Sequence, residues 1–166
     1  RFFDVTEGAI RFGDIDIRDV SQKELRNRIG YVPQKGILFS GTIASNLRYA
    51  DENLSDEKME EALTISQAKE FVDRMPNGVN EPIAQGGTNV SGGQKQRLSI
   101  ARALAKDAQV YIFDDTFSAL DYATDAKLRA ALAGLIAKKH ATVFIVAQRI
   151  SSIMHADKII VLDQGK

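Results

Sequence analysis

The chain has 166 residues, about the size of one domain, and 44% of them are hydrophobic while 27% are charged. This composition excludes a disordered tail or a fibre. Lys and Arg together number 22, as do Asp and Glu, so the net charge gives no attraction to nucleic acid, and we expect no such partner. The lack of cysteine excludes a disulfide framework, a zinc ribbon and a thiolate nucleophile. No apolar run reaches the roughly 18 residues that span a bilayer.

The first forty residues predict short strands and one short helix. A β-like run over residues 9–12, followed after a Gly-Asp turn by Asp16-Ile17, predicts a β-hairpin. Ser21 and Glu24 have the spacing of a capping box, which predicts a helix continuing through Arg28. A strand is expected over residues 29–32, because the proline that follows cannot continue a central ladder.

The middle of the chain predicts a helical insertion. Ser55 is a good N-cap, and two acidic residues follow it in the first turn, where the helix dipole favours them. Apolar residues then recur at helical spacing as far as Met75, and Pro76-Asn77-Gly78 ends the helix. A glycine-rich loop is expected over residues 78–93.

From residue 94 the pattern alternates helices with strands. Helices are predicted over 94–106 and 122–139, and apolar strands over 110–113, 142–147 and 158–163. The uninterrupted apolar run at 110–113 is typical of a strand that is buried on both faces. Such alternation indicates an α/β fold with a mostly parallel sheet and crossover helices.

Two short stretches carry the residue types of a binding site. Asp114 and Asp115 directly follow an apolar strand, and ligands of an open parallel sheet bind at the carboxyl ends of its strands. Strand ends are often acidic, so this pair alone leaves a functional and a plain surface role equally open. Ser91-Gly92-Gly93-Gln94 has the form of a capping box at the head of a helix. The same glycines and helix dipole also suit an anion.

Five motifs in order resemble those of the nucleotide-binding domains of ATP-binding cassette (ABC) exporters. Residues 90–97 resemble the signature motif, Val110–Asp114 the Walker B strand, Ser118–Asp121 the D-loop, Tyr31–Gln34 the Q-loop, and Val146–Ile150 the switch. The resemblance implies a P-loop NTPase-like, mostly parallel sheet with flanking helices plus a helical subdomain. The fold would be incomplete at the N-terminus, since no G-x-x-x-x-G-K-[ST] phosphate loop (Walker A) occurs and the family places it upstream of residues 1–8.

The resemblance also implies a division of the chain. Residues 1–39 would form part of the ATP-binding core and the antiparallel β subdomain, ending in the Q-loop. Residues 40–100 would form the helical subdomain, ending in the signature, and residues 101–166 the core with Walker B, D-loop and switch. Without Walker A the sheet would have an apolar gap, so we expect the chain alone to bind ATP poorly and to be unstable or to associate.

The family's residue roles follow by resemblance. ABC domains dimerise head to tail around two ATP molecules, so the implied partners are a second nucleotide-binding domain and transmembrane domains, which would contact residues 34–47. The implied cofactors are ATP and Mg²⁺, with Asp114 and Gln34 as metal ligands. The nucleotide-binding residues would be Gln34, Ser91, Gly92, Gly93, Gln94, Asp114 and Asp121. The implied location is the cytoplasmic face of a bacterial cell membrane.

Two catalytic positions depart from the family pattern. The position of the catalytic glutamate holds Asp115, which is one methylene shorter, and the switch position, a histidine in the family, holds Gln148. Both belong to the site that the chain builds around its own ATP, whereas the signature is intact. We therefore expect a degenerate site in one subunit of a heterodimeric exporter. A regulatory, non-hydrolytic ATP clamp and a non-transport ABC ATPase are the alternatives.

Overall fold

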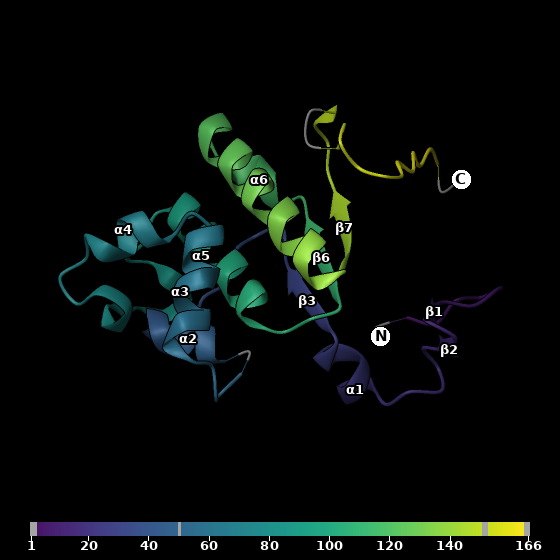
Figure 1. Ribbon diagram of the computed structural model, residues 1–166, viewed down its shortest axis with the longest axis horizontal. Helices are drawn as coiled ribbons and strands as arrows, with labels where there is room; N and C mark the ends of the chain where they lie inside the picture. Colours follow the sequence, from purple (N-terminus) through teal and green to yellow (C-terminus); the bar gives the residue numbers. More distant parts are fainter. Residues whose placement is uncertain (1–2, 50, 151–152, 165–166) are drawn as a thin grey trace.

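The computed structural model describes residues 3–49, 51–150 and 153–164. Its strands and helices, in chain order, are β1 (Arg11–Phe12), β2 (Ile15–Asp16), α1 (Gln22–Asn27), β3 (Ile29–Val32), β4 (Gly41–Thr42), α2 (Ile43–Arg48), α3 (Asp56–Ile65), α4 (Lys69–Asp73), β5 (Pro82–Ile83), α5 (Gly92–Ala105), β6 (Val110–Asp114), α6 (Tyr122–Lys139) and β7 (Thr142–Val146). Short 3-10 turns occur at Gly78–Asn80, Gln85–Gly87 and Thr116–Ala119. Figure 1 shows helices α2–α5 on one side of the central strands and the β1–β2 hairpin beyond the other.

The central sheet is parallel and has the strand order β3-β6-β7. Gly30 of β3 permits close approach of the Tyr111 ring, since a Cβ at Gly30 would lie only 2.6 Å from that ring. Asp114, the last residue of β6, pairs with Val146 at the end of β7, and Val32 of β3 pairs with Phe113. Because the strands are parallel, the segments that follow all three of them lie along one edge of the sheet.

One hydrophobic core joins the sheet to helices α2–α5, which together form the helical layer. It includes Phe113 of β6, Leu98 of α5, Leu47 of α2, Met59 of α3 and Leu128 of α6. Helix α5 is central to this packing, because it contacts α2, α3 and β3. The core therefore includes residues from all three predicted parts of the chain. The division into 1–39, 40–100 and 101–166 stays a prediction.

The sheet is covered on one face only. Tyr111 and Phe113 are buried against the helices, whereas Ile112 between them is half-buried, and Phe144 and Val146 of β7 are 55% and 53% exposed. The prediction that the 110–113 strand is buried on both faces is therefore wrong, because no described helix covers the second face. A groove of about 1130 Å³ runs between the sheet and the β1–β2 hairpin and is lined in part by Phe12, Ile112 and Phe144.

Residues 158–163 do not form the predicted strand. Their four central residues, Ile159, Ile160, Val161 and Leu162, are 50%, 73%, 82% and 76% exposed. A strand exists only where a neighbouring strand satisfies its backbone hydrogen bonds, and within the described residues the sheet contains only β3, β6 and β7. Apolar composition alone is therefore not sufficient to form a strand.

The single helix predicted from residue 55 to residue 75 is two helices, α3 and α4. The chain reverses at Gln67, whose φ of 59° is left-handed. The Ala68 N–H donates to the Leu63 carbonyl at 2.8 Å, and the Gln67 N–H donates to the Thr64 carbonyl at 3.1 Å. These two bonds define a Schellman motif, whose left-handed position is usually a glycine. A glutamine there gave no signal of the break in the sequence.

The other predicted elements are confirmed, with small changes of boundary. The hairpin is present, and Ser21 forms the capping box of α1 with Glu24. Helix α6 has the predicted bounds, and α5 begins two residues earlier than expected. The loop over 78–93 contains β5, which pairs antiparallel with β4. None of the described helices is long and apolar enough to cross a membrane.

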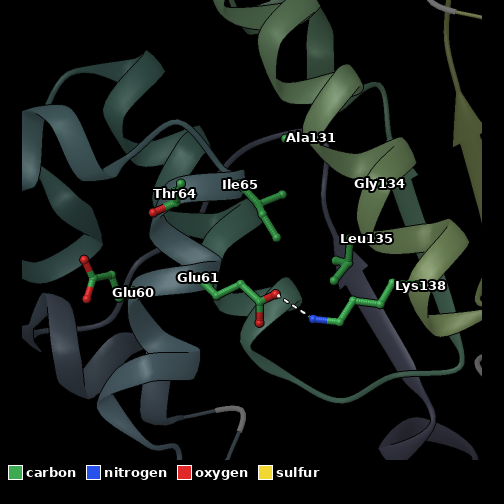
Figure 2. A pocket seen from close by; sticks show the side chains of 8 residues that line it. All are labelled: Glu60, Glu61, Thr64, Ile65, Ala131, Gly134, Leu135 and Lys138. Atoms are coloured by element: carbon green, nitrogen blue, oxygen red, sulfur yellow. Dashed lines mark ion pairs between the residues drawn. The ribbon is translucent and has the colours of Figure 1, made fainter.

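Helices α3 and α6 are separated by a cavity of about 360 Å³ (Figure 2). Ile65 of α3 and Leu135 of α6 line it, and an ion pair of 3.8 Å between Glu61 and Lys138 bridges the two helices. Gly134 lies in the middle of α6 at this cavity, and a Cβ there would meet no atom within 4 Å. The helical layer and α6 are therefore not close-packed along this line.

Candidate functional site

Three of the predicted side chains meet at the carboxyl edge of the sheet. The Nε2 atoms of Gln34 and Gln148 both donate to Oδ2 of Asp115, each at 3.2 Å. Gln34 follows β3, Asp115 follows β6 and Gln148 follows β7, so the parallel order of the strands brings them together. Two amide donors on one carboxylate oxygen hold this short side chain in place.

The backbone at Asp115 is left-handed, with φ 44° and ψ 30°. This conformation is uncommon for a residue with a side chain, and such residues concentrate at functional sites. The Asp115 N–H donates to the Val146 carbonyl at 3.0 Å, and the Ser118 hydroxyl donates to the Asp115 carbonyl at 2.7 Å. Neighbouring segments therefore fix the main chain of Asp115 as well as its carboxylate.

Asp114 is oriented by a residue that the sequence analysis did not single out. Its Oδ2 accepts a hydrogen bond of 3.1 Å from the hydroxyl of Tyr31 on β3. Burial, reinforced by this bond, raises the pKa of Tyr31, so the phenol stays protonated and remains a donor at neutral pH. Knowledge that β3 lies beside β6 would have identified Tyr31, but the sequence does not give that pairing.

The donor set fits a magnesium ion. Mg²⁺ prefers oxygen ligands and usually takes only one or two carboxylates from the protein, with waters and phosphates completing its shell. Asp114 supplies a half-buried carboxylate. Gln34 uses its N–H on Asp115, which leaves its amide oxygen available to a cation. Among the described residues no three His, Cys, Asp or Glu side chains form a cluster that could hold a metal ion.

The head of α5 has the predicted capping box. Ser91 Oγ accepts from the Gln94 N–H at 3.2 Å, and Gln94 Oε1 accepts from the Ser91 N–H at 2.9 Å. The following helix is buried along much of its length. The position of this helix head is therefore set by backbone geometry and core packing.

Gly92 and Gly93 in the first turn of α5 are not required by the fold. Neither has a positive φ, and a Cβ at either position would meet nothing within 4 Å. A glycine inside a helix costs up to about 1 kcal/mol relative to alanine. The first N–H groups of a helix lack intrahelical acceptors and suit an anion. The two glycines thus leave a bare backbone surface that a phosphate group can approach.

Asp121 is the N-cap of α6. Its Oδ1 accepts from the Thr124 N–H at 2.9 Å, and its Oδ2 accepts from the Thr124 hydroxyl at 2.7 Å. These bonds lower the pKa of Asp121. The capping role is thereby accounted for, while nucleotide binding by Asp121 stays a prediction. In the part of the chain that the structure describes, no hydrogen bond joins Asp121 or residues 91–94 to the Gln34–Asp115–Gln148 group.

A separate apolar surface lies on the segment over residues 34–49. Ile37, Phe39 and Tyr49 are 53%, 43% and 71% exposed, and the rings of Phe39 and Tyr49 lie 4.6 Å apart. The Arg102 guanidinium lies 5.1 Å from the centre of the Phe39 ring. Buried Asn46 accepts from the Phe39 N–H at 2.8 Å and donates to the Phe39 carbonyl at 2.9 Å. Exposed apolar side chains held in fixed positions are typical of an interaction surface.

A parallel sheet with an acidic carboxyl edge, packed against a helix with a glycine-rich head, is typical of nucleotide-binding α/β domains. The family model described as ABC transporter matches residues 1–118. The chain therefore belongs to the ABC transporter family, as its motifs predicted.

Similar proteins include bacterial exporters. An uncharacterised ABC transporter ATP-binding protein of Mycobacterium tuberculosis is 47% identical over 169 residues, which cover 100% of this chain and 28% of that protein. An ATP-dependent lipid A-core flippase of Desulfotalea psychrophila is 40% identical and covers 100% of this chain and 29% of that protein. A solved structure of a bacterial Atm1-family ABC exporter with ATP bound has a TM-score of 0.93 and 36% identity, covering 99% of this chain and 28% of the other. The chain thus spans less than a third of these relatives.

Proposed function

We propose that the chain is the ATP-binding part of an ABC exporter, in which ATP binding and hydrolysis between two nucleotide-binding domains drive transport across a membrane. Family membership and the fold of an ATP-bound exporter support this proposal. The flippase relatives favour transport over the non-transport alternative. The chain would act at the cytoplasmic face of a bacterial membrane. Residues 1–39 and 101–166 would supply the core, and residues 40–100 the helical subdomain.

The site at the carboxyl edge of the sheet is proposed to be degenerate. The observation that carries this proposal is the pair of 3.2 Å bonds from Gln34 and Gln148 to a single oxygen of Asp115. A catalytic base must come within about 2.6–3.2 Å of the proton it takes. An aspartate is shorter than the family's glutamate, and here two amides already hold it. Gln148 also brings no positive charge to a γ-phosphate. ATP would therefore be retained at this site and hydrolysed slowly.

The other residues receive the roles that the family resemblance implies. Asp114 and Gln34 would hold Mg²⁺, which neutralises charge on the phosphates when bound. Ser91, Gly92, Gly93 and Gln94 would contact ATP bound to the second nucleotide-binding domain through the open head of α5. Asp121, at the head of α6, would lie at the same interface. The signature would thereby complete a competent site on a different subunit.

The apolar surface of Ile37 and Phe39, within residues 34–47, together with Tyr49 just beyond them, is proposed to contact the transmembrane domains. It directly follows Gln34, so a movement of this surface would reach the amide that holds Asp115. Transport assays on Tyr49→Ala in the full-length exporter test the assignment. Transport should fall severalfold while ATP hydrolysis is retained. Full transport by this variant would contradict the contact.

A regulatory, non-hydrolytic ATP clamp is the second candidate, favoured by Asp115 and Gln148. The ATPase activity of the full-length subunit, measured with and without its partner, separates the two candidates. Hydrolysis that requires both subunits supports the exporter with one competent site. Absence of hydrolysis in the assembled pair, despite ATP binding, supports the clamp.

A further inference from the structure

Arg97, three residues beyond the capping box, connects the head of α5 to helix α4 and to the turn before α4. Its Nη1 donates to the Gln67 carbonyl at 2.9 Å, and its Nε donates to the Gly93 carbonyl at 3.4 Å. Its guanidinium lies 4.7 Å from the centre of the Phe71 ring on α4. This side chain, at the end of the signature, therefore contacts Gly93 near its start, the turn between α3 and α4, and α4 itself.

The carbonyl that receives Arg97 belongs to the Schellman turn at Gln67. The left-handed backbone there is unfavourable for a residue with a side chain. The Gln67 side chain offsets part of this cost, because its Nε2 donates to the Thr64 and Ile65 carbonyls at 3.1 and 3.4 Å. This turn orients the Gln67 carbonyl toward α5, so the acceptor for Arg97 is a backbone atom whose position the turn sets.

The electrostatic surroundings of Arg97 also connect it to the head of α6. Burial lowers the pKa of Arg97, and the carboxylates of Asp121 and Glu70 partly oppose that change. Asp121 is the N-cap of α6, so Arg97 lies within electrostatic reach of both helix heads that we assign to the dimer interface. A guanidinium with two carbonyl acceptors, a ring and a nearby carboxylate is held in one orientation.

We propose that Arg97 is a positioning residue for the signature: it fixes Gly93 against the Gln67 turn and so holds residues 91–94 where a nucleotide on a second domain can be contacted. The inference rests on the proposed function of the signature. In this role Arg97 acts through Gly93. Its effect appears at the partner subunit's site and not at the site around Asp115.

The test uses the full-length exporter with its partner subunit. ATP hydrolysis is measured as kcat and KM for Arg97→Met, Arg97→Lys and Phe71→Leu, together with thermal unfolding. Nucleotide trapping with vanadate and a photoreactive ATP analogue then reports labelling of each subunit separately. Arg74→Met is the matched control, since Arg74 is an exposed arginine on the same layer whose ion-pair partner, Glu70, is also exposed.

Arg97→Met should lower kcat between about tenfold and a hundredfold, because small misplacements of a contacting group have effects of that size. KM should change less than about twofold, since the signature engages ATP only after it has bound. Labelling of the partner subunit should fall, while labelling of this subunit persists. Arg97→Lys should recover part of the loss, Phe71→Leu should show a smaller loss, and Arg74→Met should behave as the unmodified protein.

Wild-type kcat in a folded Arg97→Met exporter would overturn the proposal, as would equal loss of labelling in both subunits, which indicates general destabilisation. If Arg97→Met does not fold, Phe71→Leu and Arg97→Lys decide the matter by the same labelling pattern. Gly92→Asp separates failure of the proposed role of the signature from failure of the positioning role of Arg97 alone. If Gly92→Asp leaves partner labelling unchanged, the proposed role of the signature is wrong. If only the Arg97 and Phe71 variants leave it unchanged, the positioning role alone is wrong.

Discussion

The head of α5 and the carboxyl edge of the sheet are built in different ways. At α5 the groups available to a ligand are backbone N–H groups, fixed by the Ser91–Gln94 capping box and by a buried helix. At the sheet edge the groups available to a ligand are the ends of side chains. Asp115 is one methylene shorter than the family's glutamate, and this difference changes what its carboxylate can reach. Substitution of one side chain can therefore disable the sheet edge and leave the head of α5 intact.

The largest effect is expected from a charge placed at α5. Gly92→Asp puts a carboxylate where the bare backbone faces a phosphate, and we expect the ATPase activity of the full exporter to fall by roughly a hundredfold or more. Gly134→Asp is the matched control, because it makes the same change at another helical glycine with open space around it. Comparable losses in both variants would show that helix disruption, and not the anion site, is responsible.

Repair of the sheet edge should have the next largest effect. Asp115→Glu combined with Gln148→His restores the family's residues, and in the Gly92→Asp background it should raise the remaining hydrolysis by about tenfold or more, because a positioned base contributes at least that much. Single-turnover hydrolysis measures the gain. No gain would indicate that the shorter carboxylate is not what limits this site.

Removal of the carboxylate should change little. Asp115→Ala should lower turnover of the heterodimer by less than about twofold, since a site that retains ATP contributes little to steady-state hydrolysis. Steady-state ATPase assays measure this loss and compare it with the loss caused by Gly92→Asp. If Asp115→Ala proves as damaging as Gly92→Asp, the two sites are equivalent and the asymmetry is wrong.

The smallest effect concerns the turn that supports α5. Gln67→Gly removes the cost of a left-handed residue and loses two weak side-chain bonds, so the free energy of unfolding should rise by about 0.5–1 kcal/mol. Thermal unfolding of the full-length exporter, compared with Gln22→Gly in α1, measures it. A lowered unfolding temperature would mean that the two Gln67 side-chain bonds stabilise the protein by more than the left-handed backbone costs.

Local chemistry predicted most of the fold. The capping boxes at Ser21 and Ser91 were predicted correctly, because these signals lie within one turn of a helix. The break at Gln67 was missed, since its cause is a backbone conformation that glutamine rarely adopts. The strand at 158–163 failed because a strand depends on a neighbour distant in sequence.

The site was predicted in its members but not in its bonds. The motifs named Gln34, Asp115 and Gln148, yet only the strand order β3-β6-β7 shows that both amides donate to one oxygen of Asp115. Tyr31 and Arg97 were missed as contributors for the same reason. Their partners lie 83 and 30 residues away along the chain.

The exposed run from Ile159 to Leu162 has a consequence for solubility. Four consecutive β-branched or leucine residues without charge, proline or glycine have the composition of segments that self-associate as cross-β ladders. Lys158 and Asp163 flank this run and act as gatekeepers, since charged ends disfavour stacking of identical strands. Acetylation of Lys158, or high salt that screens both charges, should therefore shorten the lag before the isolated chain forms thioflavin-positive aggregates.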